Sequence, residues 1–334
     1  MEQKVLRVST WVIVGALVLR LLSGGNFGAL LQRVLTPETA SWILFLQTGR
    51  LIRPTNISFT PEETTPPIET APEATLPQTP PQTQAVLTFS PEAAEEIAIN
   101  CSFDYTADLE ALLTQPLDWD LTGDKPTVLI LHTHATESFE SNGEYQESTP
   151  YRTTDTAHNM VSVGDHVAKL LEAGGISVLH DRTLHDKPSY DASYNNSRAS
   201  AQNYLKAFPS IKLVLDLHRD SYEDEDGNQI VRTVFSEGNT LAQLMFVVGT
   251  DYGGYTHPKW QENFALALKL QTQLEEICPG ICRSINLRSQ RFNQDLSTGA
   301  LLVEVGASGN TRQEALLAAE VLAEGILSLA HGSR

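Results

Sequence analysis

One stretch of the sequence constrains the fold and the chemistry more than any other: residues 127–138, with the sequence TVLILHTHATES. A short run of Val, Leu and Ile bounded by polar residues is typical of a strand covered on both faces, as in a parallel sheet. In open α/β sheets, ligands bind beyond the carboxyl ends of the strands. His132, His134 and Glu137 directly follow this run. We therefore predict a site at the end of this strand.

Two later apolar runs carry further polar residues of the same kind. Residues 211–218 end in His218, and residues 300–306 contain Glu304. Burying an unpaired carboxylate is costly, so Glu304 is expected to have a partner. If the three runs form parallel strands, His134, Glu137, His218 and Glu304 meet at one edge of the sheet.

These residue types match the requirements of a catalytic zinc centre. Imidazole nitrogens and carboxylate oxygens are both good zinc ligands. Such a centre uses three protein ligands, leaves a position for water and places a separate carboxylate nearby as the base. The pattern predicts a metallohydrolase in which His134, Glu137 and His218 hold Zn²⁺ and Glu304 is the base.

The rest of this region predicts helices alternating with strands. Apolar residues recur with helical spacing in 159–173, 260–277 and 312–329, while 176–179, 231–235 and 244–248 are typical of strands. This alternation predicts an α/β fold with a mostly parallel twisted sheet and helices on both faces. The glycine-rich residues 249–254 lack the spacing of phosphate-binding loops, so we predict a turn near the active-site edge.

Charge and cysteine content exclude some classes of protein. The formal net charge is −18, which argues against sequence-independent binding to nucleic acid and against attachment to anionic lipid by a basic patch. Three cysteines, Cys101, Cys278 and Cys282, are too few for a scaffold built on disulfides. We favour free buried thiols over a disulfide between Cys278 and Cys282.

The first 90 residues have a different character. Lys4 and Arg7 precede an apolar run at 8–22, which is shorter than the roughly 20 residues of a full membrane span. Arg20 lies near its end, where a long side chain can reach the membrane surface. The basic flank favours a cytoplasmic N-terminus. We predict that residues 1–25 are an uncleaved signal anchor with the remaining chain outside the cytoplasm; a cleaved signal peptide is the alternative.

Two further segments separate the predicted anchor from the predicted catalytic domain. Residues 26–53 form a membrane-proximal segment whose apolar patch at 42–46 is too short to span a bilayer. Residues 54–90 are rich in Pro and Thr and cannot bury enough apolar area to fold, which predicts a disordered linker. The catalytic domain is assigned to residues 91–334.

Several motifs between about residue 94 and the C-terminus resemble, in order, those of the stage II sporulation protein P family. They are HTHATESF at 132–139, DLHRD at 216–220, GTD at 249–251, WQEN at 260–263, NQDL at 293–296 and LVEVG at 302–306. The family consists of membrane-anchored cell-wall hydrolases of endospore-forming bacteria. It is grouped with the zinc-dependent N-acetylmuramoyl-L-alanine amidases.

The resemblance implies a zinc-dependent enzyme of the mother-cell membrane, single-pass, with its catalytic domain facing the septal space. The implied substrate is peptidoglycan, cut at the amide bond between muramic acid and L-alanine, with cleavage of peptide crosslinks (D,D-endopeptidase activity) as a second implied reaction. The implied role is septal wall thinning and engulfment during sporulation, with stage II sporulation proteins D and M as partners. A zinc carboxypeptidase acting on cell-wall peptides and a non-catalytic peptidoglycan-binding scaffold are the alternatives.

Roles within the site stay partly open at this point. His132 is a candidate to support the ligands, and Asp220 to orient His218. Because the carboxylate ligand of zinc amidases lies at the start of the first helix, Asp155 is an alternative to Glu137. Arg219 is a candidate to bind a substrate carboxylate, or an ordinary partner of Asp220. Asn293 is a candidate substrate contact. His180 and Asp181 are an alternative pair of ligands, but a structural role is predicted for them and for His185.

Overall fold

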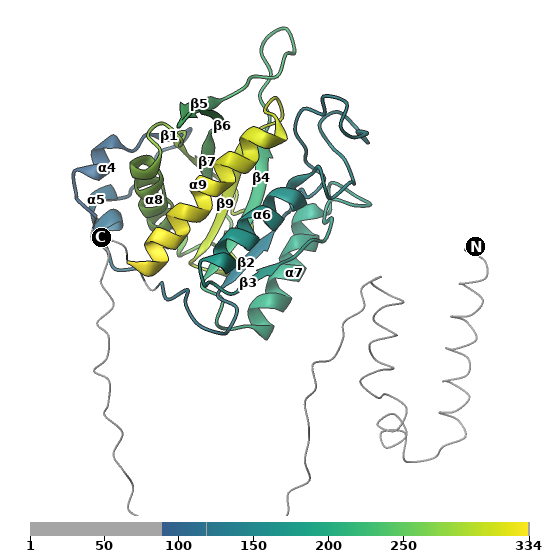
Figure 1. The fold of residues 1–334 in the computed structure, drawn as a ribbon. Coiled ribbons are helices and arrows are strands. Elements are labelled where there is room, and N and C mark those ends of the chain that lie inside the picture. Colours follow the sequence, from purple (N-terminus) through teal and green to yellow (C-terminus); the bar gives the residue numbers. More distant parts are fainter. Residues whose placement is uncertain (1–88, 118, 333–334) are drawn as a thin grey trace, which may run out of the picture. The chain divides into compact units, whose positions relative to one another are not determined.

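The computed structural model describes residues 89–117 and 119–332 (Figure 1). The predicted anchor, the membrane-proximal segment and nearly all of the predicted linker lie outside the described residues. Within the described part of the chain, no helix is both long enough and apolar enough to cross a membrane.

A seven-stranded sheet forms the centre of the described residues. Its strand order is β1-β8-β7-β9-β4-β2-β3, and every neighbouring pair is parallel except β7 and β9. This mixed α/β architecture with a mostly parallel sheet confirms the predicted fold class. The strands are β1 (Ile99–Cys101), β2 (Val128–Leu131), β3 (Val178–His180), β4 (Leu213–Asp220), β7 (Leu244–Gly249), β8 (Ile285–Arg288) and β9 (Ala300–Ala307).

The antiparallel pairing of β7 with β9 was not predicted, and it changes the place of the glycine-rich loop. Leu244 is paired with Val305, and Val247 is paired with Leu302. Gly249 at the end of β7 therefore lies toward the beginning of β9, away from Glu304. The prediction that residues 249–254 form a turn near the active-site edge was wrong, because a run of apolar residues does not reveal strand direction.

Helices cover both faces of the sheet, as predicted (Figure 1). On one face, α7 (Ser193–Ala207) packs Ala201 against Leu129, Leu131 and Val214. On the other face lie three long helices, whose apolar side chains form the main core: α6 (Met160–Ala173), α8 (Trp260–Ile277) and α9 (Arg312–His331). Each large aliphatic side chain buried in this way contributes about 1.5–3 kcal/mol.

Local sequence signals explain where two of these helices begin. Asn159 accepts a hydrogen bond from the backbone N–H of Val161 at the start of α6. Thr311 and Glu314 form a capping box at the start of α9. These contacts satisfy backbone N–H groups that have no partner within a helix. They also fix the first turns of α6 and α9, which emerge at the carboxyl edge of the central strands.

Smaller elements complete the described structure. Lys269 of α8 is buried and its Nζ donates to the carbonyl oxygens of Leu112, at 2.7 Å, and Leu113, which ties the N-terminal part to the core. Burial lowers the pKa of Lys269 to about 8. All three cysteines are free thiols. The smaller elements are α4 (Ala93–Glu96), α5 (Leu109–Thr114), the hairpin of β5 (Thr233–Ser236) and β6 (Asn239–Ala242), and the 3₁₀ turn η1 (Gln294–Leu296).

Candidate active site

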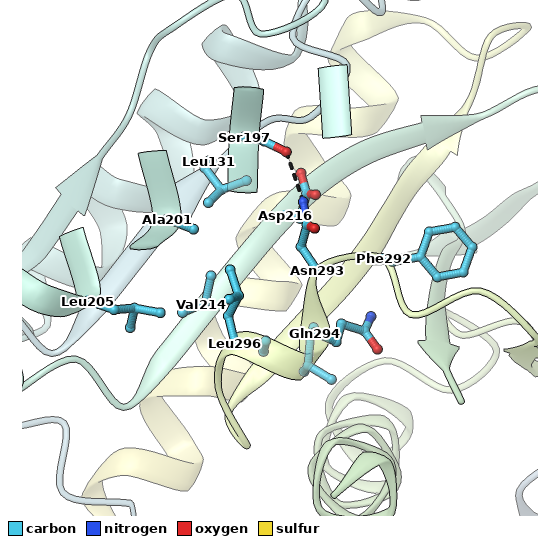
Figure 2. A pocket seen from close by; sticks show the side chains of 12 residues that line it. Leu131, Ser197, Ala201, Leu205, Val214, Asp216, Phe292, Asn293, Gln294 and Leu296 are labelled. Carbon is cyan, nitrogen blue, oxygen red and sulfur yellow. Dashed lines mark hydrogen bonds between the residues drawn. The ribbon is translucent and has the colours of Figure 1, made fainter. Parts of the chain in front are cut away.

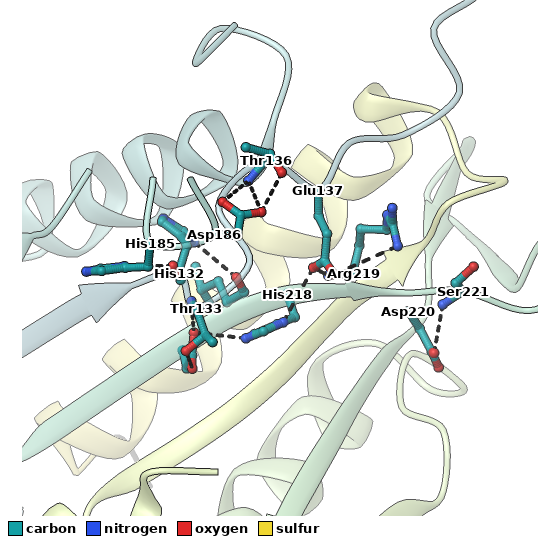
Figure 3. Close-up of polar contacts among 12 residues, drawn as sticks. His132, Thr133, Thr136, Glu137, His185, Asp186, His218, Arg219, Asp220 and Ser221 are labelled. Atoms are coloured by element: carbon teal, nitrogen blue, oxygen red, sulfur yellow. Dashed lines mark hydrogen bonds and ion pairs between the residues drawn. The ribbon is translucent and has the colours of Figure 1, made fainter. Parts of the chain in front are cut away.

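Three adjacent parallel strands bring the predicted site residues together. In the sheet β4 lies between β2 and β9, and His218 of β4 is paired with Glu304 of β9. His134 and Glu137 lie in the turn that follows β2. Figure 3 shows Glu137, His218 and Arg219 grouped at the end of β4. The strand-end argument therefore placed these side chains at one edge of the sheet.

His218 lies at the centre of this group, between two carboxylates. Its Nδ1 is 3.4 Å from Oε2 of Glu137, and its Nε2 is 3.0 Å from Oδ1 of Asp216. Burial alone would lower the pKa of His218, but the charges and hydrogen bonds of Asp216 and Glu137 raise it well above its ordinary value. The structure thus supports a positive charge between these two carboxylates.

Glu137 is a buried carboxylate with several cationic neighbours. Its Oε1 lies 3.2 Å from Nη2 of Arg152, and its Oε2 accepts a 3.3 Å hydrogen bond from the backbone N–H of Arg219. Burial acts to raise the pKa of Glu137, but the contact with His218 and the charge of Arg219 outweigh it and lower the pKa to about 2. Glu137 is therefore ionised at neutral pH.

His134 lacks the hydrogen bonds that buried histidines usually have. Its ring stacks on Tyr190 with centroids 4.4 Å apart and meets the ring of His218 edge-on at 5.2 Å. Its Nδ1 is buried without a hydrogen-bond partner. Burial, together with the charge of His218, lowers the pKa of His134 to about 4. His134 thus presents a neutral imidazole with a free nitrogen.

Glu304 is the second group in the site with an unsatisfied atom. Its Oε2 is buried and has no hydrogen-bond partner. Burial is the largest influence on this carboxyl and raises its pKa to about 8. A carboxyl group with a pKa near the working pH is suited to accept and return a proton.

Tyr194, at the start of α7, also faces this site and was missed in the sequence. Its ring meets that of His134 edge-on with centroids 5.5 Å apart. Burial raises its pKa, and the carboxylates of Asp216, Glu304 and Glu137 raise it further. The phenol therefore keeps its proton and is a hydrogen-bond donor. No pattern in the sequence distinguished this tyrosine from its neighbours.

Asp216 and Arg152 are two further contributors that sequence reasoning did not identify. Asp216 accepts a 2.8 Å hydrogen bond from the backbone N–H of Thr133, so it connects β4 to the turn after β2 as well as contacting His218. Arg152 bridges Glu137 and Asp186, each at 3.2 Å. Asp216 had a usable signal, because residues two apart in a strand share a face. Arg152 comes from a long polar loop and had none.

A second group of histidines lies beside the site, and all its ring nitrogens have partners. His132 Nε2 is 2.8 Å from Nε2 of His180, and His132 Nδ1 is 3.0 Å from the carbonyl oxygen of Leu217. His180 Nδ1 is 3.1 Å from Asp165. His185 Nδ1 lies 2.9 Å from the carbonyl oxygen of His132. We call His132, His180 and Asp165 the paired histidine cluster. Its contacts agree with the structural role predicted for His180.

Two alternatives from the sequence do not contact His218. Asp155 has a side chain that is 52% exposed and pairs with His158 at 3.0 Å, so it does not replace Glu137 beside His218. Asp220 pairs with Arg283 at 2.9 Å, and the carboxylate beside His218 is Asp216. The expectation that Asp220 orients His218 was wrong, because an irregularity of the strand between His218 and Asp220 breaks the alternation and Asp220 is held by Arg283 instead.

Arg219 and Asn293 have structural contacts. Nε and Nη2 of Arg219 donate to the carbonyl oxygens of Ser138 and Tyr151, at 2.8 and 2.7 Å. The Arg219 side chain is buried, so neither the predicted substrate contact nor a pair with Asp220 is found. Asn293 donates to Ser197 at 3.2 Å, beside Asp216 (Figure 2). This bond holds residues 292–294 against α7 next to Tyr194.

The site contains the types of nitrogen and oxygen atoms that bind zinc, although these side chains are not arranged around one common metal position. Within residues 89–117 and 119–332, no group of three or more His, Cys, Asp or Glu residues is arranged to hold a metal ion. However, His134 Nδ1 is a buried nitrogen without a partner. His218 has its Nδ1 toward Glu137 and its Nε2 toward Asp216. A histidine with a carboxylate at its second nitrogen is the usual arrangement of a metal-ligating histidine.

The fold and the site together define a class: an α/β domain with histidines and carboxylates gathered where parallel strands end. Comparison with known families is more specific. The family model of Stage II sporulation protein P (SpoIIP) matches residues 56–327. The chain belongs to this family, as its motifs suggested. It is 30% identical over 214 residues to the stage II sporulation protein P of Bacillus subtilis (strain 168), a match that covers 61% of this chain. The chain spans about half the length (51%) of that relative.

Solved structures with related folds include two amidases. The chain is similar to the N-acetylmuramoyl-L-alanine amidase AmiC2 of Nostoc punctiforme, with 16% identity, a TM-score of 0.38, and coverage of 62% of this chain and 98% of the amidase. It is also similar to the amidase Ami1 of Mycobacterium smegmatis, with 15% identity, a TM-score of 0.38, and coverage of 64% and 100%. At such TM-scores nothing about the chemistry of this chain follows from the likeness.

Proposed function

We propose that this protein is a zinc-dependent peptidoglycan hydrolase of sporulation, an N-acetylmuramoyl-L-alanine amidase that cuts the amide bond between muramic acid and L-alanine. Its family supports the substrate class and the role in septal wall thinning. The observation that carries the chemistry is the buried Oε2 of Glu304, which has no hydrogen-bond partner and lies on β9 at the residue that is paired with His218 of β4. Buried polar atoms without a partner are uncommon in folded proteins, and both Glu304 and His134 have one in this site.

His134, Glu137 and His218 are the residues that would hold Zn²⁺. When bound, the metal polarises a carbonyl oxygen and lowers the pKa of its water from about 15.7 to about 7. Asp216 contacts Nε2 of His218 and so fixes which nitrogen is free for the metal. Arg152 holds Glu137 in place by an ion pair at 3.2 Å.

The remaining site residues have roles in moving protons and stabilising charge. Glu304 takes a proton from the attacking water and returns it to the leaving amine, as its pKa near neutrality allows. Tyr194 keeps its proton and donates a hydrogen bond to the oxygen that becomes negative. Tyr190 stacks on His134 and covers one face of that ring.

The same proposal includes the setting of the enzyme. We infer that residues 1–25 anchor the chain in the mother-cell membrane and that the catalytic domain lies outside the cytoplasm, facing the septal space. The apolar run at 8–22 and its basic flank support this assignment. Family membership supports joint action with stage II sporulation proteins D and M. Protease accessibility in intact cells, measured on a tagged chain, tests the orientation.

The activity is tested with the purified full chain, intact peptidoglycan and mass spectrometry, with the zinc content measured on the same sample. We expect free stem peptides with new lactyl ends and one zinc per chain, and no such products with His218→Ala. Glu262→Gln, which removes an exposed carboxylate on α8, is the control and should match the unmodified chain. Cleaved peptide crosslinks would show that the enzyme also has endopeptidase activity. Release of single amino acids would show a carboxypeptidase instead, and an intact wall without bound metal would leave a binding scaffold.

A further inference from the structure

A pocket of about 390 Å³ lies between α6 and α9, on the face of the sheet opposite α7. Figure 1 shows these two helices side by side. The pocket is bounded by the loop before α6, by the residue stretch that follows β3, and by the first two turns of α9. Its lining residues are Thr156, Ala157, Ser162, Asp165, His166, Lys169, Arg182, Arg312 and Leu316.

The periodicity of the helices explains how this lining forms. Residues three, four and seven apart lie on one side of a helix. Ser162, Asp165, His166 and Lys169 of α6 have this spacing and line the pocket together. Their apolar neighbours, such as Val163 and Val167, belong to the core. The polar stripe of α6 therefore faces α9 next to Arg312.

The charge of this pocket is opposite to that of the whole chain. The sequence has 41 acidic residues against 23 Lys and Arg. Among the lining residues, Lys169, Arg182 and Arg312 are basic and only Asp165 is acidic. Basic residues on a surface are usually just solvated. Here, however, three of the few basic residues of an acidic chain converge on one concave surface.

The contacts within the pocket leave two of these cations available. Arg182 pairs with Asp165, which neutralises both. Arg312 uses its Nε for a 3.1 Å hydrogen bond to Ser162 Oγ. No acceptor is found for Lys169 Nζ among the described residues. Because Arg182 and Asp165 cancel each other, Lys169 and Arg312 leave the pocket with a net charge of about +2. This charge would balance the −1.5 to −2 of a phosphate group at neutral pH.

Arg312 lies where the dipole of α9 favours an anion. Arg312 is the first residue of α9, where the helix dipole favours negative charge and opposes a cation. The first turn of α6 contains no acidic residue. The capping box residue Glu314 offsets part of this charge in α9. An oxyanion bound between Arg312 and Lys169 would complete the balance.

We propose that this pocket between α6 and α9 is a binding site for a phosphate group, held by Lys169 and Arg312. The guanidinium of Arg312 presents planar donors to two oxygens, and Lys169 adds a point charge. This site is separate from Glu304 and His218, so the proposal goes beyond the hydrolase and does not rest on it. The phosphate belongs either to a soluble ester or to a lipid headgroup, which share the same chemistry.

The purified full chain is titrated with inorganic phosphate at constant ionic strength, and binding is followed by calorimetry and by the thermal unfolding temperature. We expect saturable binding with a rise in unfolding temperature. The double variant Lys169→Gln, Arg312→Gln should bind phosphate at least about tenfold more weakly, since each lost charge-assisted contact weakens an oxyanion complex. Lys206→Gln, which removes an exposed lysine on α7, is the matched control and should bind like the unmodified chain.

Three results would overturn the site: no saturable binding of phosphate, equal binding in the double variant, or equal weakening by Lys206→Gln. Acetate of the same concentration should bind much more weakly, because it carries one charge; equal binding would remove the assignment to phosphate. Two phosphate monoesters, glycerol 3-phosphate in solution and phosphatidic acid in vesicles, distinguish a soluble ester from a lipid headgroup. Peptidoglycan hydrolysis by the double variant should be unchanged. The two measurements therefore distinguish failure of the phosphate site from failure of the proposed hydrolase function.

Discussion

His132 and His134 are two residues apart in the sequence, and both lie at the end of the same strand, but their surroundings differ in one respect. Both ring nitrogens of His132 have partners, in His180 and the carbonyl oxygen of Leu217. Nδ1 of His134 has none, and neither does Oε2 of Glu304 nearby. The paired histidine cluster and the candidate active site are therefore neighbours that use the same residue types in opposite ways.

The difference shows what separates a structural histidine from a functional one at a sheet edge. A buried polar atom left unpaired costs about 1–3 kcal/mol, so such atoms are rare in folded proteins. The paired histidine cluster avoids this cost with contacts of 2.8 to 3.1 Å. The candidate active site accepts it at several atoms, among them Nδ1 of His134, Nε2 of His218 and Oε2 of Glu304. Position at a strand end predicts both groups equally well, whereas unsatisfied atoms identify only one of them.

Among variants that keep the metal, the largest effect is expected from Glu304→Gln. The amide keeps the size of the side chain but cannot accept the proton of the attacking water, so hydrolysis of peptidoglycan should fall by about 10²–10⁴-fold. Zinc content, measured by elemental analysis, should remain at the level of the unmodified chain. Loss of the metal along with activity would instead make Glu304 a ligand.

A pair of variants sets the two histidine groups directly against each other. His134→Ala removes a proposed ligand and should abolish both zinc binding and hydrolysis. His180→Ala removes a partner of His132 and should lower the free energy of unfolding by about 1–3 kcal/mol, while one zinc per chain is retained. Urea unfolding and elemental analysis on both variants give the comparison. Equal loss of zinc in both variants would contradict the distinction between the paired histidine cluster and the candidate active site.

Tyr194→Phe is expected to have an intermediate effect on catalysis. The phenol donates to the developing negative charge in our proposal, and loss of one such donor costs about 10²–10³-fold in kcat. KM and zinc content should change little. A rise in KM with unchanged kcat would instead assign Tyr194 to substrate binding. Tyr204→Phe, on the same helix, provides the control.

Gly164→Ala tests the packing of the paired histidine cluster without touching the candidate active site. A Cβ at this position would lie 2.5 Å from Nε2 of His180 and 2.6 Å from Nε2 of His132. Both rings are held by hydrogen bonds, so the added methyl group should cost about 1–3 kcal/mol of stability through overpacking. Thermal unfolding measures the loss. Unchanged stability would mean that the rings are free to move apart.

The last effects concern pH, and they have opposite signs in the two groups. Burial raises the pKa of Glu304 from 4.5 to about 8, so the stability this group provides is complete below pH 4.5 and is lost as the pH rises through about 8. Burial lowers the pKa of His132 from 6.5 to about 3, so its contribution is complete above pH 6.5 and is lost as the pH falls toward 3. Since one pKa unit corresponds to about 1.4 kcal/mol, each limb of this pH dependence amounts to at most about 5 kcal/mol.

Urea unfolding of the metal-free chain between pH 4 and 9, with a chelator present, measures both limbs. Glu304→Gln should remove the loss on the alkaline side and leave the acid side unchanged. The alkaline limb would have another origin if it persisted in this variant.

Much of the fold was predictable because it depends on patterns within short segments. The helix at 260–277 was predicted with the bounds that α8 has in the structure. The buried strands of the centre were also found, since sheets covered on both faces require continuous apolar runs. The strands β1 and β8 were missed, because in each of them a polar Asn interrupts the apolar residues of an already short strand.

The sequence by itself determined that His134, Glu137, His218 and Glu304 follow or occupy buried strands, and parallel strands that end together bring such residues to one edge. Only the tertiary structure decided which of the histidines is paired. The partner of His132 lies 48 residues away in the sequence. Tyr194 is likewise distant in the sequence from the carboxylates that surround it, and the α6–α9 pocket is lined by residues from separate segments. The physical reason is that periodicity and strand ends are local properties, whereas the satisfaction of a buried polar atom depends on every side chain that packs around it.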